Sequence, residues 1–207
     1  MKRIVLCAMT ALLLPAASEV SAQPLIAPTE PLTPAEQQKK FKLPPGFEIQ
    51  LVASEPQINQ PMNLNFDSRG RLWVTTTIEY PFPASDPDKA RDRLVVFDGI
   101  GAGGKPAKSH VFADKLNIPI GIVPLKGGKE AIVWSIPHIW KMTDTDDDGV
   151  ADKREILFGP FDYVDTHGNQ NAFRYHLDGW VYANHGFRNN SNQIKRGGEG
   201  DVVMQMQ

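Results

Sequence analysis

The sequence predicts an all-β fold assembled from the blades of a β-propeller, and three observations lead to that prediction. Short runs of apolar and aromatic residues alternate with turns rich in Gly, Asp and Pro along residues 45–207. No stretch of that range shows sustained helical periodicity. One hairpin pattern also recurs at a spacing of roughly 50 residues, which is typical of propeller blades. A β-sandwich with similar hairpins is the alternative interpretation.

The recurring hairpin has the form aromatic residue, turn, glycine, apolar residue and aromatic residue. It occurs at Phe66–Val74 and again at Tyr175–Ala183, with a looser copy at Val123–Trp134. Blades of ~50 residues leave room for about three of them here, whereas propellers close with four to eight. We therefore expect an incomplete propeller, a fragment whose remaining blades are missing.

Other short runs bounded by turn residues predict the remaining strands. The segment Phe47–Val52 alternates apolar and polar residues, as a half-buried strand does. Seven more segments are expected to form strands: Asn63–Asp67, Leu72–Thr76, Leu94–Phe97, His110–Ala113, Ile132–Met142, Ile156–Phe158 and Val202–Gln205. The four tryptophans are expected in the core between blades.

The first 22 residues have the three parts of a secretory signal peptide. Lys2 and Arg3 precede an uncharged apolar run at Ile4–Ala17, and Val20–Ala22 offers small residues to a signal peptidase. A membrane-spanning helix is the alternative, but the run is shorter than the ~20 residues that a span needs and contains Pro15. We expect export, to the periplasm or the extracellular space.

The composition and the distribution of proline, cysteine and charge give the domain bounds and exclude several kinds of site and partner. Residues 23–44 are a proline-rich linker in which Thr33 and Glu36 can open one short helix, and residues 45–207 are the propeller domain. Cys7, the only cysteine, leaves with the signal peptide, so no disulfide, thiol nucleophile or haem-attachment motif is expected. The net charge of −2 argues against a nucleic-acid partner. No later segment is long and apolar enough to cross a membrane.

An acidic loop at Asp144–Glu155 carries the most specific local motif, Asp-x-Asp-x-Asp-Gly followed by five residues and Glu. Oxygen ligands on alternate residues let one loop wrap around Ca²⁺, and the glycine permits the sharp turn. The expected ligands are Asp144, Asp146, Asp148, the Val150 carbonyl, Asp152 and Glu155. The flanking segments predict strands rather than the helices of an EF-hand, and an acidic turn without metal is the alternative.

A second candidate site surrounds the last copy of the hairpin. His167 precedes that hairpin and can act as a general base near neutral pH. The polar side chains nearby can hydrogen-bond a polyhydroxylated ligand, namely those of Gln170, Asn171, Asn184 and His185. All of these residues are expected where strands end, and therefore at one mouth of the propeller. A surface histidine without a function is the alternative for His167.

Four segments together resemble one known family: Leu43–Ile49, Phe66–Val74, Asp144–Glu155 and His167–Gly186. They are similar to the planctomycete-type membrane-bound dehydrogenase propellers, relatives of the glucose/sorbosone dehydrogenases, and the resemblance covers residues 43–207. It implies a propeller of six blades when complete. In the related quinoprotein sugar dehydrogenases, a histidine ahead of such a hairpin removes a proton from a sugar hydroxyl while hydride passes to pyrroloquinoline quinone (PQQ). The resemblance gives that role to His167.

The resemblance also has gaps. Those enzymes have Gly-Asp-Gln-Gly after the hairpin, close to the substrate, whereas this chain has Ala183–Gly186. Their later blades supply basic residues that hold the quinone, and many family members carry a C-terminal cytochrome c module; this sequence contains neither. We therefore predict an exported quinoprotein-like dehydrogenase of a sugar or another alcohol, inactive as a fragment. The alternative is a non-catalytic, calcium-stabilised propeller that binds carbohydrate or a protein partner.

Overall fold

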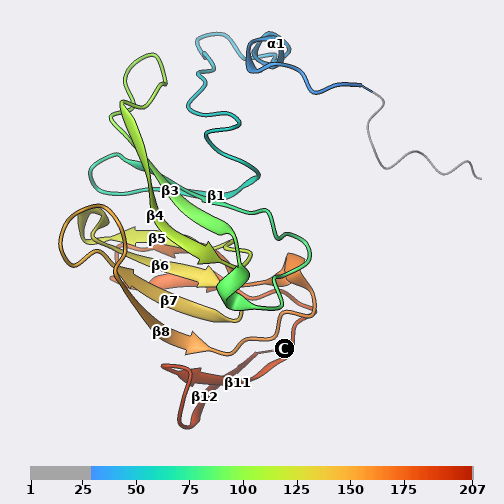
Figure 1. Cartoon of the computed structure of the whole chain (residues 1–207), viewed down its shortest axis with the longest axis vertical. Helices are drawn as coiled ribbons and strands as arrows, with labels where there is room; N and C mark the ends of the chain where they lie inside the picture. Colours follow the sequence, from blue (N-terminus) through green and yellow to red (C-terminus); the bar gives the residue numbers. More distant parts are fainter. Residues whose placement is uncertain (1–28, 207) are drawn as a thin grey trace, which may run out of the picture.

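The computed structural model describes residues 29–206 and shows a nearly all-β chain (Figure 1). The expected signal peptide, residues 1–22, lies outside the described residues. Within the described range the strands are β1 (Pro61–Phe66), β2 (Leu72–Thr76), β3 (Asp92–Asp98), β4 (Lys108–Leu116), β5 (Ile122–Leu125), β6 (Glu130–Ser135), β7 (His138–Thr143), β8 (Lys153–Gly159), β9 (Asn171–Tyr175), β10 (Val181–Asn184), β11 (Ser191–Arg196) and β12 (Val202–Met206). Single-turn 3₁₀ helices are η1 (Pro87–Lys89), η2 (Lys126–Gly128) and η3 (Thr166–Gly168).

One short α-helix, α1 (Pro34–Gln38), precedes these strands in the described chain. Thr33 is its N-cap and Pro34 stands in its first turn, as the sequence predicts. The Thr33 side chain accepts a hydrogen bond from the Glu36 backbone, and the Glu36 carboxylate accepts one from the Thr33 backbone in return. No helix of the described residues is long and apolar enough to cross a membrane.

The strands form antiparallel sheets in which neighbours in sequence are neighbours in space. The first sheet has the order β1-β2-β3-β4, and β5, β6, β7 and β8 follow one another in the same way in the second. Four-stranded antiparallel sheets of this order are the blades of a propeller. The pair β9–β10 is a separate hairpin, while β11 and β12 continue the second sheet beyond β8. In Figure 1 the β11–β12 hairpin lies at the end of the molecule opposite to α1.

The first strands of successive hairpins lie side by side. Strand β1 contacts β5, and β5 contacts β9. The Asn65 side chain on β1 joins the first two by donating to the Ile122 carbonyl on β5, at 3.2 Å. Adjacent first strands are the arrangement found around a propeller axis, so the structure confirms the all-β, propeller-type fold.

The hairpins β1–β2 and β9–β10 close with the same turn. In the first, the Asp67 backbone donates to Arg71 and Gly70 donates to Asp67, at 3.1 and 3.0 Å. In the second, His176 donates to Trp180 and Gly179 donates to His176, at 2.9 and 3.0 Å. Both glycines have positive φ, 75° for Gly70 and 86° for Gly179, a conformation that a side chain strains. The repeat found in the sequence therefore corresponds to a repeated structure.

The main core lies between the first sheet and the strands β5–β8 of the second. Trp73, Val96 and Phe112 of the first sheet pack against Val133 and Met142 of the second, and all five are at most 1% exposed. The Trp73 and Phe112 rings meet edge to face with centroids 4.6 Å apart. A second cluster under the loops contains Trp134, Ile136, Phe161, Phe173 and Ile194.

Three sequence predictions are wrong in detail. Phe47–Val52 has no strand partner among the described residues and is not a strand, although its alternation is that of one. The expected strand Ile132–Met142 is a hairpin, because the chain turns between Ser135 and His138 and pairs β6 with β7. Trp180 is 70% exposed rather than buried between blades.

Candidate functional site

The two longest loops between strands in the described chain, together with two shorter ones, lie at one end of β1, β5 and β9. Residues 77–91 follow β2, 117–121 precede β5, 160–170 precede β9, and 185–190 follow β10. The tight hairpin turns lie at the other end of these strands. Hydrogen bonds join the loops: Thr166 Oγ1 donates to the Pro81 carbonyl at 2.9 Å, and Ala84 N donates to Asn117 Oδ1 at 3.1 Å. We call this end the long-loop face.

A pocket of about 620 Å³ opens on the long-loop face. Its size lies within the ~300–1,000 Å³ range of small-molecule sites. Three loops supply its lining, which comprises Pro81, Phe82, Pro83, Tyr163, Val164, Asp165, Thr166, His167 and Arg188. The apolar members protrude into solvent, since Phe82 is 81% and Val164 88% exposed. The ionisable groups are one carboxylate, one imidazole, one guanidinium and one phenol.

His167 and Asp165 form a hydrogen-bonded pair in this pocket. Asp165 is the N-cap of η3 and accepts from the His167 backbone at 3.1 Å. The same oxygen, Oδ1, lies 3.0 Å from His167 Nδ1. A neutral imidazole that donates Nδ1–H to a carboxylate has an unprotonated Nε2, and that nitrogen can accept a proton. The His167 side chain is 69% exposed, and its ring lies edge to face with Tyr80 at 5.3 Å.

Asn189 holds the turn that carries this pair. Its side chain is 1% exposed, accepts from Asp165 N at 2.9 Å, and donates to the carbonyls of Asp165 and Gly168, each at 3.0 Å. Gly186 N also donates to the Gly168 carbonyl at 2.8 Å. A Cβ on Gly186 would overlap the Gly168 backbone, so the two chain segments can approach this closely only with glycine there.

The other residues expected to contact a ligand do not line this pocket. Gln170 is 2% exposed with Nε2 unpaired in the described structure, and Asn171 Nδ2 donates to the Asn169 carbonyl. Asn184 stands opposite Asn171 in the β9–β10 hairpin. His185 Nε2 lies 2.8 Å from Ser191 Oγ. None of these four residues therefore lines the pocket that contains His167.

Asp165, Tyr80, Arg188 and Asn189 are the functional candidates that the sequence reasoning missed. Only Asp165 has a local signal, since an Asp two residues before a His can cap the turn that carries it. The other three come from two other loops: Tyr80 contacts the His167 ring from residues 77–91, and Arg188 and Asn189 belong to residues 185–190.

The acidic loop between β7 and β8 brings three carboxylates together. One oxygen from each of Asp144, Asp146 and Asp148 lies within 4.8 Å of the others. Asp144 is 5% exposed, and its carboxylate accepts from the backbone of Asp147, Asp148 and Gly149, at 2.6, 3.2 and 2.9 Å. These bonds fix the loop in a compact turn. Three carboxylates are a partial set for Ca²⁺, which takes six to eight oxygen ligands.

Two of the other expected ligands, Asp152 and Glu155, lie outside this group. Asp152 accepts two hydrogen bonds from Thr145, one from its backbone N–H and one from its hydroxyl. Glu155 is paired with Lys153 and Lys141, each at 3.2 Å, and both lysines lower the pKa of its carboxyl. Of the five carboxylates that the motif predicts as ligands, the structure therefore brings three together.

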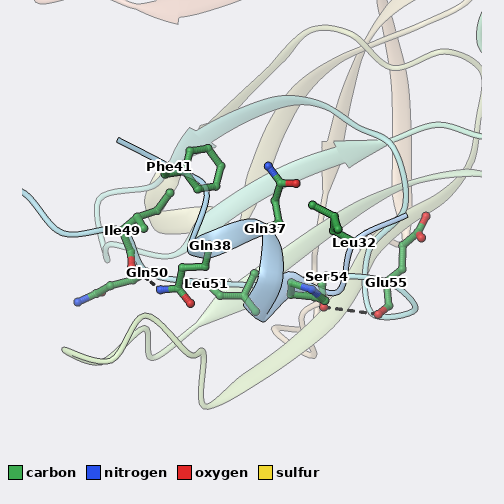
Figure 2. Close-up of a pocket in the computed structure, with 10 residues that line it drawn as sticks. Leu32, Gln37, Gln38, Phe41, Ile49, Gln50, Leu51, Ser54 and Glu55 are labelled. Carbon is green, nitrogen blue, oxygen red and sulfur yellow. Dashed lines mark hydrogen bonds between the residues drawn. The ribbon is translucent and has the colours of Figure 1, made fainter. Parts of the chain in front are cut away.

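A further groove of about 560 Å³ lies between α1 and the segment 49–55 (Figure 2). Leu32, Phe41, Ile49 and Leu51 make its lining mostly apolar, and Glu55 is its one ionisable residue. Gln38 Nε2 donates to the Ile49 carbonyl at 2.8 Å and ties the helix to that segment. This groove contains no acid–base pair, so the His167 pocket is the better candidate for chemistry.

Comparison with known proteins identifies one sequence family, whose description is "Domain of unknown function (DUF7133)" and which matches residues 33–206. No curated protein is a significant match. A solved structure, the holo form of the PQQ domain of pyranose dehydrogenase from Coprinopsis cinerea, is 18% identical with a TM-score of 0.48. The match covers 66% of this chain and 29% of that one, so the chain spans less than a third of that structure.

Proposed function

This chain belongs to the DUF7133 family, and we propose that it is an exported, quinoprotein-like propeller that binds a sugar or another alcohol in the His167 pocket and takes part in its oxidation. The observation that carries the proposal is the pair of His167 Nδ1 and Asp165 Oδ1, 3.0 Å apart in an open pocket of about 620 Å³. The sequence resemblance gives His167 the same role independently.

Oxidation of an alcohol removes a proton from the hydroxyl and a hydride from the carbon that bears it. His167 Nε2 is the group that takes the proton, because Nδ1 is engaged by Asp165. The Asp165 carboxylate then stabilises the imidazolium that forms. The exposed apolar side chains of Phe82 and Tyr163 offer a surface for the apolar face of a sugar ring.

PQQ is the cofactor that the resemblance implies, and it would supply the hydride acceptor. It carries three carboxylates, which require cationic partners. Arg188 is the one lysine or arginine lining the pocket in the described chain and can hold a single carboxylate. The described residues therefore fit the quinone only in part.

The acidic loop favours a second candidate function, a calcium-stabilised propeller that binds without catalysis. Asp144, Asp146 and Asp148 already converge, and their mutual repulsion would be relieved by a divalent cation. In this case His167 would contact a bound carbohydrate or protein without accepting a proton.

The test is a calorimetric titration of the full-length protein with PQQ in calcium-containing buffer, followed by dye-reduction assays with a panel of sugars and alcohols. We expect about one quinone per chain, and loss of dye reduction in His167→Ala. His185→Ala is the matched control, since His185 bonds Ser191 and does not line the pocket. Absence of both quinone binding and dye reduction would leave the binding propeller as the better description.

A further inference from the structure

Arg188 is a cation without a carboxylate partner in the described structure. Its side chain is exposed and makes no ion pair among residues 29–206, although it lines the same pocket as His167. The one acid in the pocket lining, Asp165, is occupied by the His167 side chain and backbone. An unpaired guanidinium in the same pocket as a hydrogen-bonded imidazole offers a second, differently charged contact to one ligand.

The backbone at Arg188 is fixed although its side chain is free. The next residue, Asn189, is buried and makes three hydrogen bonds to the turn of Asp165 and Gly168. Asn190 N donates to Asp162 Oδ2 at 2.9 Å on the other side. Arg188 and His167 therefore start from positions that one hydrogen-bond network holds relative to each other, which lowers the entropic cost of binding one ligand with both.

We propose that the pocket selects a hydroxy acid, such as a sugar acid, with its carboxylate on Arg188 and a hydroxyl directed to His167. This inference rests on the proposed function of the same pocket and adds the charge of the substrate. Arginine is suited to the role because its planar guanidinium can bind a carboxylate through two parallel N–H···O bonds. A neutral sugar leaves this cation without a partner.

The carboxylate that Arg188 binds has two possible sources, the substrate and PQQ. We assign it to the substrate because Arg188 lines the pocket from the loop that also holds the His167 turn, where the reacting hydroxyl must lie. An experiment that measures binding of each compound separately distinguishes the two sources.

The experiment compares glucuronate with glucuronamide, which has the same hydroxyls and no charge. Chemical-shift titrations of the ¹⁵N-labelled chain measure the affinity of each ligand for the unmodified protein, Arg188→Gln and Arg174→Gln. Arg174 is the matched control, since it is also exposed and lacks an ion pair in the described chain. It lies at the end of the strands opposite to the long-loop face, in a pocket that Tyr175 and Lys126 also line. PQQ binding is measured calorimetrically with the same three proteins.

We expect the unmodified protein to bind glucuronate up to about fivefold more tightly than glucuronamide, because a contact between exposed charged groups is worth at most about 1 kcal/mol. Arg188→Gln should remove this preference and Arg174→Gln should keep it. Higher salt should weaken glucuronate binding more than glucuronamide binding.

Equal affinity for the two ligands, no binding of either, or a preference that survives in Arg188→Gln would each overturn the inference. So would an Arg188→Gln protein that loses PQQ and keeps the preference for glucuronate. These readouts do not depend on turnover. A charge preference in a protein without dye reduction would defeat the dehydrogenase proposal alone, and dye reduction without a charge preference would defeat this inference alone.

Discussion

Asn189 and Asp165 hold each other through two hydrogen bonds, with Asn189 Oδ1 accepting from Asp165 N at 2.9 Å and Asn189 Nδ2 donating to Asp165 O at 3.0 Å. The Asn189 amide thus bonds both the N–H and the C=O of Asp165, as a residue on a neighbouring antiparallel strand does. The turn that carries His167 is therefore positioned by a residue 22 places later in the sequence.

Asn189→Ala should destabilise the protein and loosen the His167 turn. The substitution leaves Asp165 N without its partner and removes one of two hydrogen bonds from the carbonyls of Asp165 and Gly168, and a buried polar group left unpaired costs about 1–3 kcal/mol. Urea unfolding measures the free energy, and hydrogen exchange of the amides at 165–168 reports the turn itself. Asn190→Ala is the control, because Asn190 is exposed and contributes only its backbone N–H to Asp162. Equal protection of these amides in both variants would contradict the positioning role.

Asp165→Asn should weaken His167 as a base while keeping the turn. The asparagine oxygen can replace Oδ1 and accept from both the backbone N–H and the Nδ1–H of His167, but it carries no negative charge. We expect the Nδ1–H form of the neutral ring in both proteins, as read from ¹⁵N shifts of the ring. Any proton transfer by His167 should slow by about tenfold or more, because the imidazolium that forms loses its carboxylate partner. An unchanged rate of proton transfer would show that the Asp165 charge does not assist the base.

Calcium should raise the thermal stability through the acidic loop. A ligand at 100 times its dissociation constant stabilises the folded state by about 2.7 kcal/mol. Asp146→Asn should abolish the increase, since Asp146 is an exposed member of the converging carboxylates and makes no hydrogen bond in the described structure. Asp201→Asn removes the same charge from an exposed site outside the loop and should keep it. If calcium leaves the melting temperature unchanged, the loop is an empty acidic turn.

His138 should make stability fall as the pH drops below neutrality. Burial lowers the pKa of His138 in the folded chain, whereas the unfolded chain has a pKa of about 6.5. The unfolded state therefore binds the proton first, so the contribution is complete above about pH 6.5 and is lost as the pH falls towards the folded-state pKa. His138→Phe keeps an aromatic contact with Trp140, whose ring centroid lies 5.5 Å away, and removes the titration. Urea unfolding at pH 7.5 and 5.5 should show a smaller decrease for the variant; an equal decrease would assign the effect elsewhere.

Part of the fold follows from local sequence patterns. The glycines at positions 70 and 179 mark two turns with the same hydrogen bonds, because a positive φ favours glycine in any context. Short apolar runs bounded by turn residues also predict β1, β2, β3 and β4 at their observed places. The alternation of apolar and polar residues at Phe47–Val52 predicts a strand wrongly, since a strand exists only where a second strand accepts its hydrogen bonds.

The acidic loop shows how tertiary pairing overrides a local motif. The spacing of carboxylates predicts Glu155 as the closing calcium ligand, but the register of β7 and β8 places Glu155 directly opposite Lys141. Lys141 is therefore an oppositely charged cross-strand neighbour of Glu155, and the two side chains form an ion pair that needs no metal. The converging Asp144, Asp146 and Asp148 lie within one turn, and so their arrangement is largely a local property.

By itself, the sequence determined the β-hairpins, the repeated turn, the acidic turn and the choice of His167 as the candidate base, because each depends on residues close together along the chain. Only the tertiary structure decided which groups surround His167. Tyr80 and Arg188 come from separate loops, and the buried side chain of Asn189 fixes the turn from behind. Such contacts depend on how the strands pack around the axis, and no pattern of neighbouring residues encodes that packing.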